Sequence, residues 1–316
     1  MSGKSNAIES RAVTPGTKIF PGFVLGALGV LAFSLSLPAT RVAVQQLDPW
    51  FVAFARAVGA AFLAALYLGL TRAPRPARAQ WPRLAIVALG VVFGFPLFTS
   101  LALTTQTSAH GAVVVTVLPA MTAVFAVLRA AERPPLLFWL SSAAGLLTVF
   151  AFLILTGTVH GGLTLADFYL LAAVVLCALG YAEGGALART LGGARTICWA
   201  LLLALPITIP IALTAAVTHP PQANTQTWTA FAYVTVVSMF LGFFAWYAGL
   251  ARGGIARVGQ IQLAQPILTL LWSAVLLSEP VSPAAMTAAA VVLTCVLLTQ
   301  RTRTGSSRRA HGRSST

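Results

Sequence analysis

Two charged side chains stand inside long apolar stretches, where an ionised group is rare. Arg56 lies about two helical turns into the stretch 50–70, and Glu183 lies near the end of the stretch 166–187. An unpaired arginine at the centre of a membrane helix costs about 2.5–3.5 kcal/mol on the insertion scale. Arg56 therefore either snorkels to the membrane surface or faces a polar cavity, where it is available to a substrate carboxylate or an acidic partner.

Glu183 also has two interpretations. Pairing with Arg189, or contact with water at the inner end of its helix, explains the residue without any transport chemistry. Because burial disfavours a charged carboxylate, Glu183 is alternatively a site that takes up and releases a proton. It is the leading candidate for proton coupling, since no other Asp or Glu lies well within an apolar stretch.

Neutral polar and aromatic residues form a second set of candidates. Gln262, Gln265 and Thr269 are spaced by three and four, which puts them on one face of a helix. Such a face either makes hydrogen bonds between helices or lines a cavity. Three aromatic residues are candidates for a cavity wall, with plain packing as the alternative: Trp199, Trp246 and Tyr247.

Two prolines fall within apolar stretches. Pro119 and Pro266 each remove a backbone hydrogen-bond donor from a helix. The carbonyl that is freed is tolerated only where it faces protein or a water-filled cavity. Both prolines are candidate hinges beside a pathway, although a static packing kink explains them equally well.

No pattern indicates a metal, a cofactor or catalysis. The three cysteines lie in apolar stretches without a CxxC pair, and His110 at a predicted turn is expected to be solvated. The chain has no HExxH, GxSxG, Asp-rich or P-loop motif. We therefore predict no metal site, no cofactor and no enzyme activity.

Composition indicates what positions these residues. Charged residues make up 8% of the 316 residues, hydrophobic residues 58%, and the mean hydropathy is +0.87. Soluble proteins average roughly 25% charged residues. This excludes a cytosolic enzyme, a secreted disulfide scaffold and a disordered regulator. The apolar runs are continuous and do not alternate every second residue, which predicts an all-α membrane protein.

A helix needs about 20 apolar residues to cross a bilayer, which gives ten predicted transmembrane helices. Their ranges are 20–44, 50–70, 84–103, 108–129, 136–155, 166–187, 196–217, 228–250, 255–277 and 283–300. With the N-terminus inside, 18 of the 20 basic residues fall in inner segments, as the positive-inside rule requires. The net charge of +14 thus indicates membrane orientation and not nucleic-acid binding. A multi-pass protein of the cell (cytoplasmic) membrane with both termini cytoplasmic is predicted.

The two halves carry the same spacing in opposite orientations. Pro119 stands thirteen residues before Glu132, and Pro266 stands thirteen before Glu279, an offset of 147 residues. We expect both glutamates to cap a neighbouring helix or to pair with arginine. Five helices per half is an odd number, so the second half must enter the membrane upside down, as in inverted-repeat transporters. The predicted organisation is an N-terminal tail (1–19), two inverted five-helix repeats (20–155 and 166–300) and a basic tail (301–316).

Several segments resemble the drug/metabolite transporter superfamily, and within it the EamA-type ten-helix transporters. They are FARA with Arg56, LTLADFYLLAA, and YAGLARGGIARVGQIQLAQPILTLLWSAVLLSEPVS across the eighth and ninth helices. In the first helix the family often has Trp-Gly where this chain has Phe33-Ser34. The resemblance implies a secondary transporter that exports a small metabolite, amino acid or drug by alternating access.

The alternatives are a membrane-embedded enzyme acting on lipid-linked substrates and a passive channel. The expected partners are a small-molecule substrate, protons as a candidate coupling ion, and membrane lipid, without nucleic acid. A repeat that completes its own pathway permits a monomer or a homodimer.

Overall fold

The computed structural model describes residues 19–130 and 164–284, together with scattered positions between 136 and 151 and between 286 and 294. Every element in these residues is a helix. The first half contains α1 (Ile19–Ser34), α2 (Ser36–Val44), α3 (Pro49–Leu70), η2 (Arg78–Gln80), α4 (Trp81–Val87), η3 (Ala88–Gly94), α5 (Phe95–Ala102), α6 (Ser108–Val115) and α7 (Leu118–Ala130). The second contains α9 (Leu165–Leu191), α10 (Gly193–Thr218), α11 (Thr225–Tyr233), η4 (Val234–Leu241), α12 (Gly242–Gly253), α13 (Ile255–Gly259), η5 (Gln260–Leu263) and α14 (Ala264–Leu277).

Eight helices of the described residues are long and apolar enough to cross a membrane. They are 21–44, 49–70, 78–102, 108–129, 165–191, 193–218, 225–253 and 255–277. Each overlaps one predicted span, so eight of the ten predicted helices are confirmed as helices of membrane-spanning length. The predicted spans 136–155 and 283–300 lie outside the described residues except at scattered positions. The chain is a multi-pass, all-helical membrane protein.

Local sequence explains where these helices begin and turn. Asp48 accepts hydrogen bonds from the backbone nitrogens of Trp50 and Phe51, at 2.9 and 3.0 Å, and Pro49 occupies the first helical position of α3. This is the expected start of a helix, because the carboxylate satisfies amide groups that have no partner within the helix. The outward faces carry exposed apolar side chains such as Phe62 and Val217, which suit contact with lipid.

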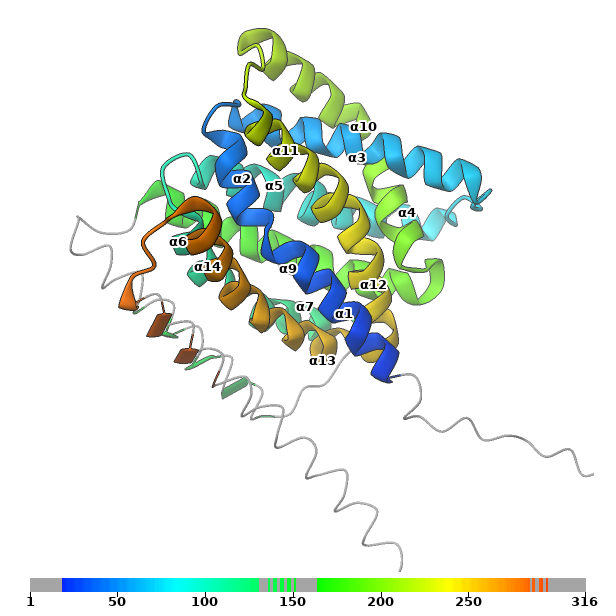
Figure 1. The fold of residues 1–316 in the computed structure, drawn as a ribbon. Coiled ribbons are helices and arrows are strands. Elements are labelled where there is room, and N and C mark those ends of the chain that lie inside the picture. Colours follow the sequence, from blue (N-terminus) through cyan, green and yellow to red (C-terminus); the bar gives the residue numbers. More distant parts are fainter. Residues whose placement is uncertain are drawn as a thin grey trace, which may run out of the picture.

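Several helix pairs bring the halves of the chain together, among them α3 with α10 and α7 with α9. α1 packs along α12, and α9 packs along η3 and α5 (Figure 1). A Cβ built on Gly22 would lie 2.9 Å from the backbone nitrogen of Gly253, and one on Gly90 would lie 2.8 Å from the Cα of Gly180. Small residues let backbones approach this closely, which is how helices associate in a membrane.

Five of the membrane-length helices are interrupted near their centres. α1 and α2 meet at Leu35, and α6 and α7 are separated by residues 116–117. η3 and η4 are π-helical segments of the third and seventh described spans, and η5 is a 3₁₀ segment in the eighth. Pro119 and Pro266, the candidate hinges, each lie within three residues after such an interruption.

The polar contacts define two opposite ends of the bundle. Near the end of α9, Glu183 meets the start of α4 and the end of α7. Near the start of α9, Asp167 meets the start of α6, and the start of α6 also contacts Glu279 beyond the end of α14. We call these the Glu183 end and the Glu279 end.

Candidate functional site

A small, partly enclosed cavity lies between the two ends, where the interrupted helices meet. Its volume is about 20 Å³, which is room for one or two water molecules. Its polar lining comes from Ser36, Arg56, Tyr181, Ser238 and Gln265, and its remaining lining from Phe33, Val91, Phe95, Cys177, Met239 and Phe243. These residues come from both halves of the chain. Transporters expose polar backbone groups to their substrates where membrane helices are interrupted. The cavity therefore lies where a substrate site is expected.

Arg56 is the only charged side chain that lines this cavity among the described residues. It is 3% exposed, and its Nη1 donates one long hydrogen bond of 3.4 Å to Oγ1 of Thr40. Its Nε has no hydrogen-bond partner in the described part of the chain. The guanidinium is thus buried in the bundle, and it does not reach the membrane surface.

The four carboxylates of the described residues are all engaged elsewhere. Asp48 caps α3, Asp167 binds His110 and Thr164, Glu183 binds two arginines, and Glu279 caps α6. Within residues 19–130 and 164–284, Arg56 therefore has no counter-ion. A buried charge without a partner is costly, and the protein retains this one beside a cavity.

The glutamine face reaches the cavity through one member. Gln265 lines it, and Nε2 of Gln262 donates to Oε1 of Gln265 at 3.3 Å. Oε1 of Gln262 has no hydrogen-bond partner among the described residues. Thr269 turns instead to the first helix, where its Oγ1 donates to the carbonyl of Ser34 at 2.6 Å. The face both links helices and contributes to the cavity.

None of the three predicted aromatic residues lines the cavity, but Trp246 and Tyr247 each pack against one of its rings, Tyr247 at 5.2 Å from Phe243. Trp246 is fully buried, its indole nitrogen has no described partner, and its ring lies 5.2 Å from that of Tyr181, which lines the cavity. Tyr247 donates from its hydroxyl to the carbonyl of Gly180 at 3.1 Å, a helix-to-helix contact. Trp199 packs against Trp81, with ring centroids 5.8 Å apart, and neither lines the cavity.

Several residues that line the cavity were not among the leading candidates from the sequence. The hydroxyls of Ser36 and Ser238 lie 2.7 Å apart, 202 residues apart in the chain. Phe33 packs its ring 5.0 Å from Phe243 and 6.1 Å from Tyr181. Aromatic and small polar residues are common in apolar helices, and only the helix interruptions at Leu35 and η4 could have singled these out.

At the Glu183 end, ion pairs join the two halves of the chain. Glu183 is 1% exposed and binds Arg83 through one carboxylate oxygen and Arg129 through the other, the latter at 2.9 Å. The expected partner had been Arg189. The two arginine side chains are 38% and 41% exposed, so they remain partly solvated while they neutralise the buried carboxylate.

At the Glu279 end, hydrogen bonds to a carboxylate join the two halves of the chain. Glu279 accepts hydrogen bonds from the hydroxyl and amide of Ser108 and the amide of Ala109, at 2.7, 3.2 and 3.1 Å. The hydroxyls of Ser108 and Ser273 also lie 2.7 Å apart. The prediction that Glu279 caps a neighbouring helix is confirmed, whereas Glu132 lies outside the described residues.

His110 departs from its predicted solvated state. Its Nε2 lies 2.7 Å from Oδ1 of Asp167, which joins the start of α6 to the start of α9. The sequence shows the two residues 57 positions apart, and nothing in their spacing indicates contact.

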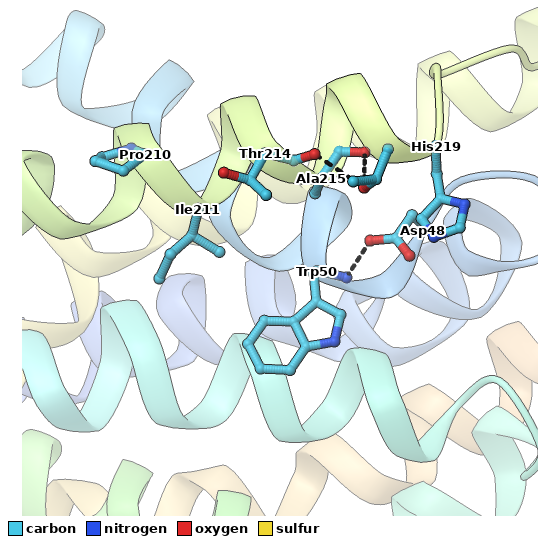
Figure 2. Close-up of a pocket in the computed structure, with 8 residues that line it drawn as sticks. Asp48, Trp50, Pro210, Ile211, Thr214, Ala215 and His219 are labelled. Atoms are coloured by element: carbon cyan, nitrogen blue, oxygen red, sulfur yellow. Dashed lines mark hydrogen bonds between the residues drawn. The ribbon is translucent and has the colours of Figure 1, made fainter.

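A larger pocket of about 380 Å³ lies on the outside of the bundle, between the start of α3 and the end of α10 (Figure 2). It is lined by Asp48, Trp50, Pro210, Ile211, Thr214, Ala215, Thr218 and His219. Asp48 is already occupied as the α3 cap, and Trp50 is 43% exposed. The pocket is an open groove at the protein surface.

Comparison with known proteins agrees with a polytopic transporter. The model of the EamA-like transporter family matches residues 20–154 and 164–301. An uncharacterized transporter of Bacillus subtilis (strain 168), YdeK, is 46% identical over 280 residues, covering 89% of this chain and 97% of that protein. A solved structure, described only as the crystal structure of a protein, aligns with a TM-score of 0.64 over 88% of this chain and 98% of its own. At 19% identity it shows a shared fold alone.

These observations define a multi-pass helical membrane protein of the transporter class. The chain belongs to the EamA-like transporter family.

Proposed function

We propose that the protein is a secondary transporter of the cytoplasmic membrane that exports a small organic solute by alternating access. The observation that carries this proposal is a small, partly enclosed cavity with several polar groups, which lies between two sets of contacts that each join the halves of the chain. A carrier needs a site that opens to one side at a time, and two separable closures around one cavity supply it. Membership of a transporter family supports the class of function.

The two halves are proposed to be inverted five-helix repeats in a ten-helix protein. The offset of 147 residues relates Ser108, at the start of α6, to Ile255, at the start of α13, and brings η3 to within one residue of η4. The family model matches each half separately. Arg129 lies at the Glu183 end and Leu165 at the Glu279 end, which agrees with one further crossing between them.

The Glu183 end is proposed to face the cytoplasm. The arginine-rich segment before α4 and the arginine at the end of α7 both lie there, in agreement with the positive-inside rule. Opening this end requires Glu183 to part from Arg83 and Arg129, so we assign the three residues to an inner gate.

Proton coupling through Glu183 stays a prediction. Its carboxylate is bound by Arg83 and Arg129, so a coupling role requires these contacts to part during transport. Replacement of Glu183 by Gln tests it: coupling through this residue predicts that a pH gradient no longer drives transport. Transport driven equally well by a pH gradient in Glu183→Gln would remove the residue from proton coupling.

Counterflow in proteoliposomes tests the proposed function. Vesicles preloaded with a solute identified by efflux screening should take up labelled solute faster than empty vesicles, and uptake should saturate. The surface variant Arg252→Gln, on an exposed side chain at the end of α12, serves as the matched control and should behave as wild type. Flux that rises linearly without trans-stimulation would indicate a channel, and consumption of the solute would indicate an enzyme.

A further inference from the structure

We propose that the site around this cavity binds a small organic monoanion with an apolar body once the helices part to enlarge it beyond its present volume of about 20 Å³, and that Arg56 is the residue that selects the anionic group. This inference rests on the proposed function and narrows its substrate class. Arg56 is only 3% exposed, and it lines the cavity. Its Nε has no hydrogen-bond partner among the described residues.

No carboxylate of the described residues neutralises the charge of Arg56. The four carboxylates of the described residues are bound to other groups, as set out above. The cavity offers the guanidinium only neutral neighbours such as Ser36, Ser238 and Gln265. An unpaired buried charge disfavours folding unless something else repays its desolvation, and a bound anion does so.

One guanidinium fixes the charge of the ligand. A planar fork of N–H donors matches the two oxygens of a carboxylate. A single positive charge neutralises one negative charge, so a monoanion suits the site better than a phosphate dianion. A cationic solute would be repelled, which argues against the cationic drugs within the broad class that the resemblance implies.

The rest of the lining fixes the body of the ligand. Apart from Ser36, Arg56, Ser238 and Gln265, the wall is aromatic or apolar, with Phe33, Phe95 and Phe243 as its rings. Such a wall favours a hydrocarbon or aromatic body and a single polar head. Three polar atoms without described partners lie in or next to this region: Nε of Arg56, Nε1 of Trp246 and Oε1 of Gln262.

Thermal unfolding of the purified full chain in detergent tests the inference with two probe mixtures. The first contains small monocarboxylic acids with apolar bodies, and the second contains the corresponding neutral amides. A ligand that binds the folded state raises the melting temperature. We expect the acids to raise it at least three times as much as the amides do in the wild type.

Variants of Arg56 and Arg41 distinguish a loss of anion binding from a general loss of stability. Arg56→Gln should lose the response to the acids, and Arg56→Lys should keep part of it because the charge remains without the fork. Arg41→Gln is the matched control, since Arg41 donates to backbone carbonyls of Leu103 and Thr104 at the Glu279 end. It should respond to the acids as wild type does. Arg56→Met should melt at a higher temperature than wild type without ligand, which a purely structural arginine would not allow.

Three results would overturn the inference. They are no stabilisation by the acid mixture, equal stabilisation by the amides, and an unchanged acid response in Arg56→Gln. The proposed function fails separately: acids that bind but show no counterflow would refute transport while leaving the monoanion site intact. Counterflow of a neutral or cationic solute, without competition by the acids, would refute the monoanion site while leaving transport intact.

Discussion

Glu183 and Arg56, two of the buried charged residues in the described part of the chain, are treated in opposite ways. Glu183 is 1% exposed and has an arginine on each carboxylate oxygen, whereas Arg56 is 3% exposed and has one long hydrogen bond to a threonine. The charge of Glu183 is neutralised by side chains of the protein itself. Under the proposed mechanism, the Glu183 ion pairs break when that end opens, and Arg56 gains its counter-ion from the bound solute.

Breaking the bridge should give the largest change in stability. The double variant Arg83→Ala/Arg129→Ala leaves a buried carboxylate without a partner, which should cost about 3–5 kcal/mol of unfolding free energy. Each single variant leaves one arginine in place and should cost far less, so the pair should be clearly non-additive. Denaturant unfolding in detergent followed by tryptophan fluorescence measures both. Additive losses of similar size would show that the two pairs do not share the charge.

Removing the other charge should change stability in the opposite direction. Arg56→Met replaces an unpaired guanidinium by an apolar chain of similar length, and should stabilise the ligand-free protein by at least about 1 kcal/mol. The same unfolding assay applies, with Arg41→Met as the control that loses real hydrogen bonds. A loss of stability in Arg56→Met as large as that in Arg41→Met would erase the contrast between the two charges.

The Glu279 end should tolerate change more readily than the Glu183 end. Glu279→Gln keeps a hydrogen-bond acceptor for Ser108 and Ala109 but removes its charge, and should cost about 1 kcal/mol, as helix-cap substitutions do. Transport should persist with a shifted balance between outward-open and closed states. A cost equal to that of the double arginine variant would make this end an equal partner in stability.

Tyr247→Phe should give the smallest effect. It removes the 3.1 Å hydrogen bond to the carbonyl of Gly180, a net contribution of about 0.5–1.5 kcal/mol, and keeps the packed ring. Ligand affinity should not change, because the residue does not line the cavity. A tenfold loss of affinity in Tyr247→Phe would place this hydroxyl in the binding site.

The sequence predicted the helices better than the site, for a physical reason. Hydrophobic length alone locates a span, and the predicted 50–70 and 255–277 agree with Pro49–Leu70 and Ile255–Leu277. Rarity of charge pointed to Arg56 and Glu183. The partners of Glu183 were missed because Arg83 and Arg129 are 100 and 54 residues away in the chain and fit the positive-inside rule on their own.

Aromatic residues gave the least reliable signal. Trp199, Trp246 and Tyr247 all stand in apolar helices. Trp246 and Tyr247 each pack against a ring of the cavity wall, Trp199 packs against Trp81, and none of the three lines the cavity. The periodicity of an all-apolar helix does not tell which face meets the cavity. Ser238 was missed for the same reason, since it is one small polar residue among many.

The native thiol of Cys177 tests the account most directly, because it lines the cavity. In a Cys198→Ser/Cys295→Ser background, a membrane-impermeant maleimide is applied to right-side-out and to inside-out vesicles. Glu183→Gln should raise the labelling rate from the cytoplasmic side and lower it from the outside, and Glu279→Gln should do the reverse. Rates that rise from both sides together, or that change in neither variant, would contradict alternating access around this cavity.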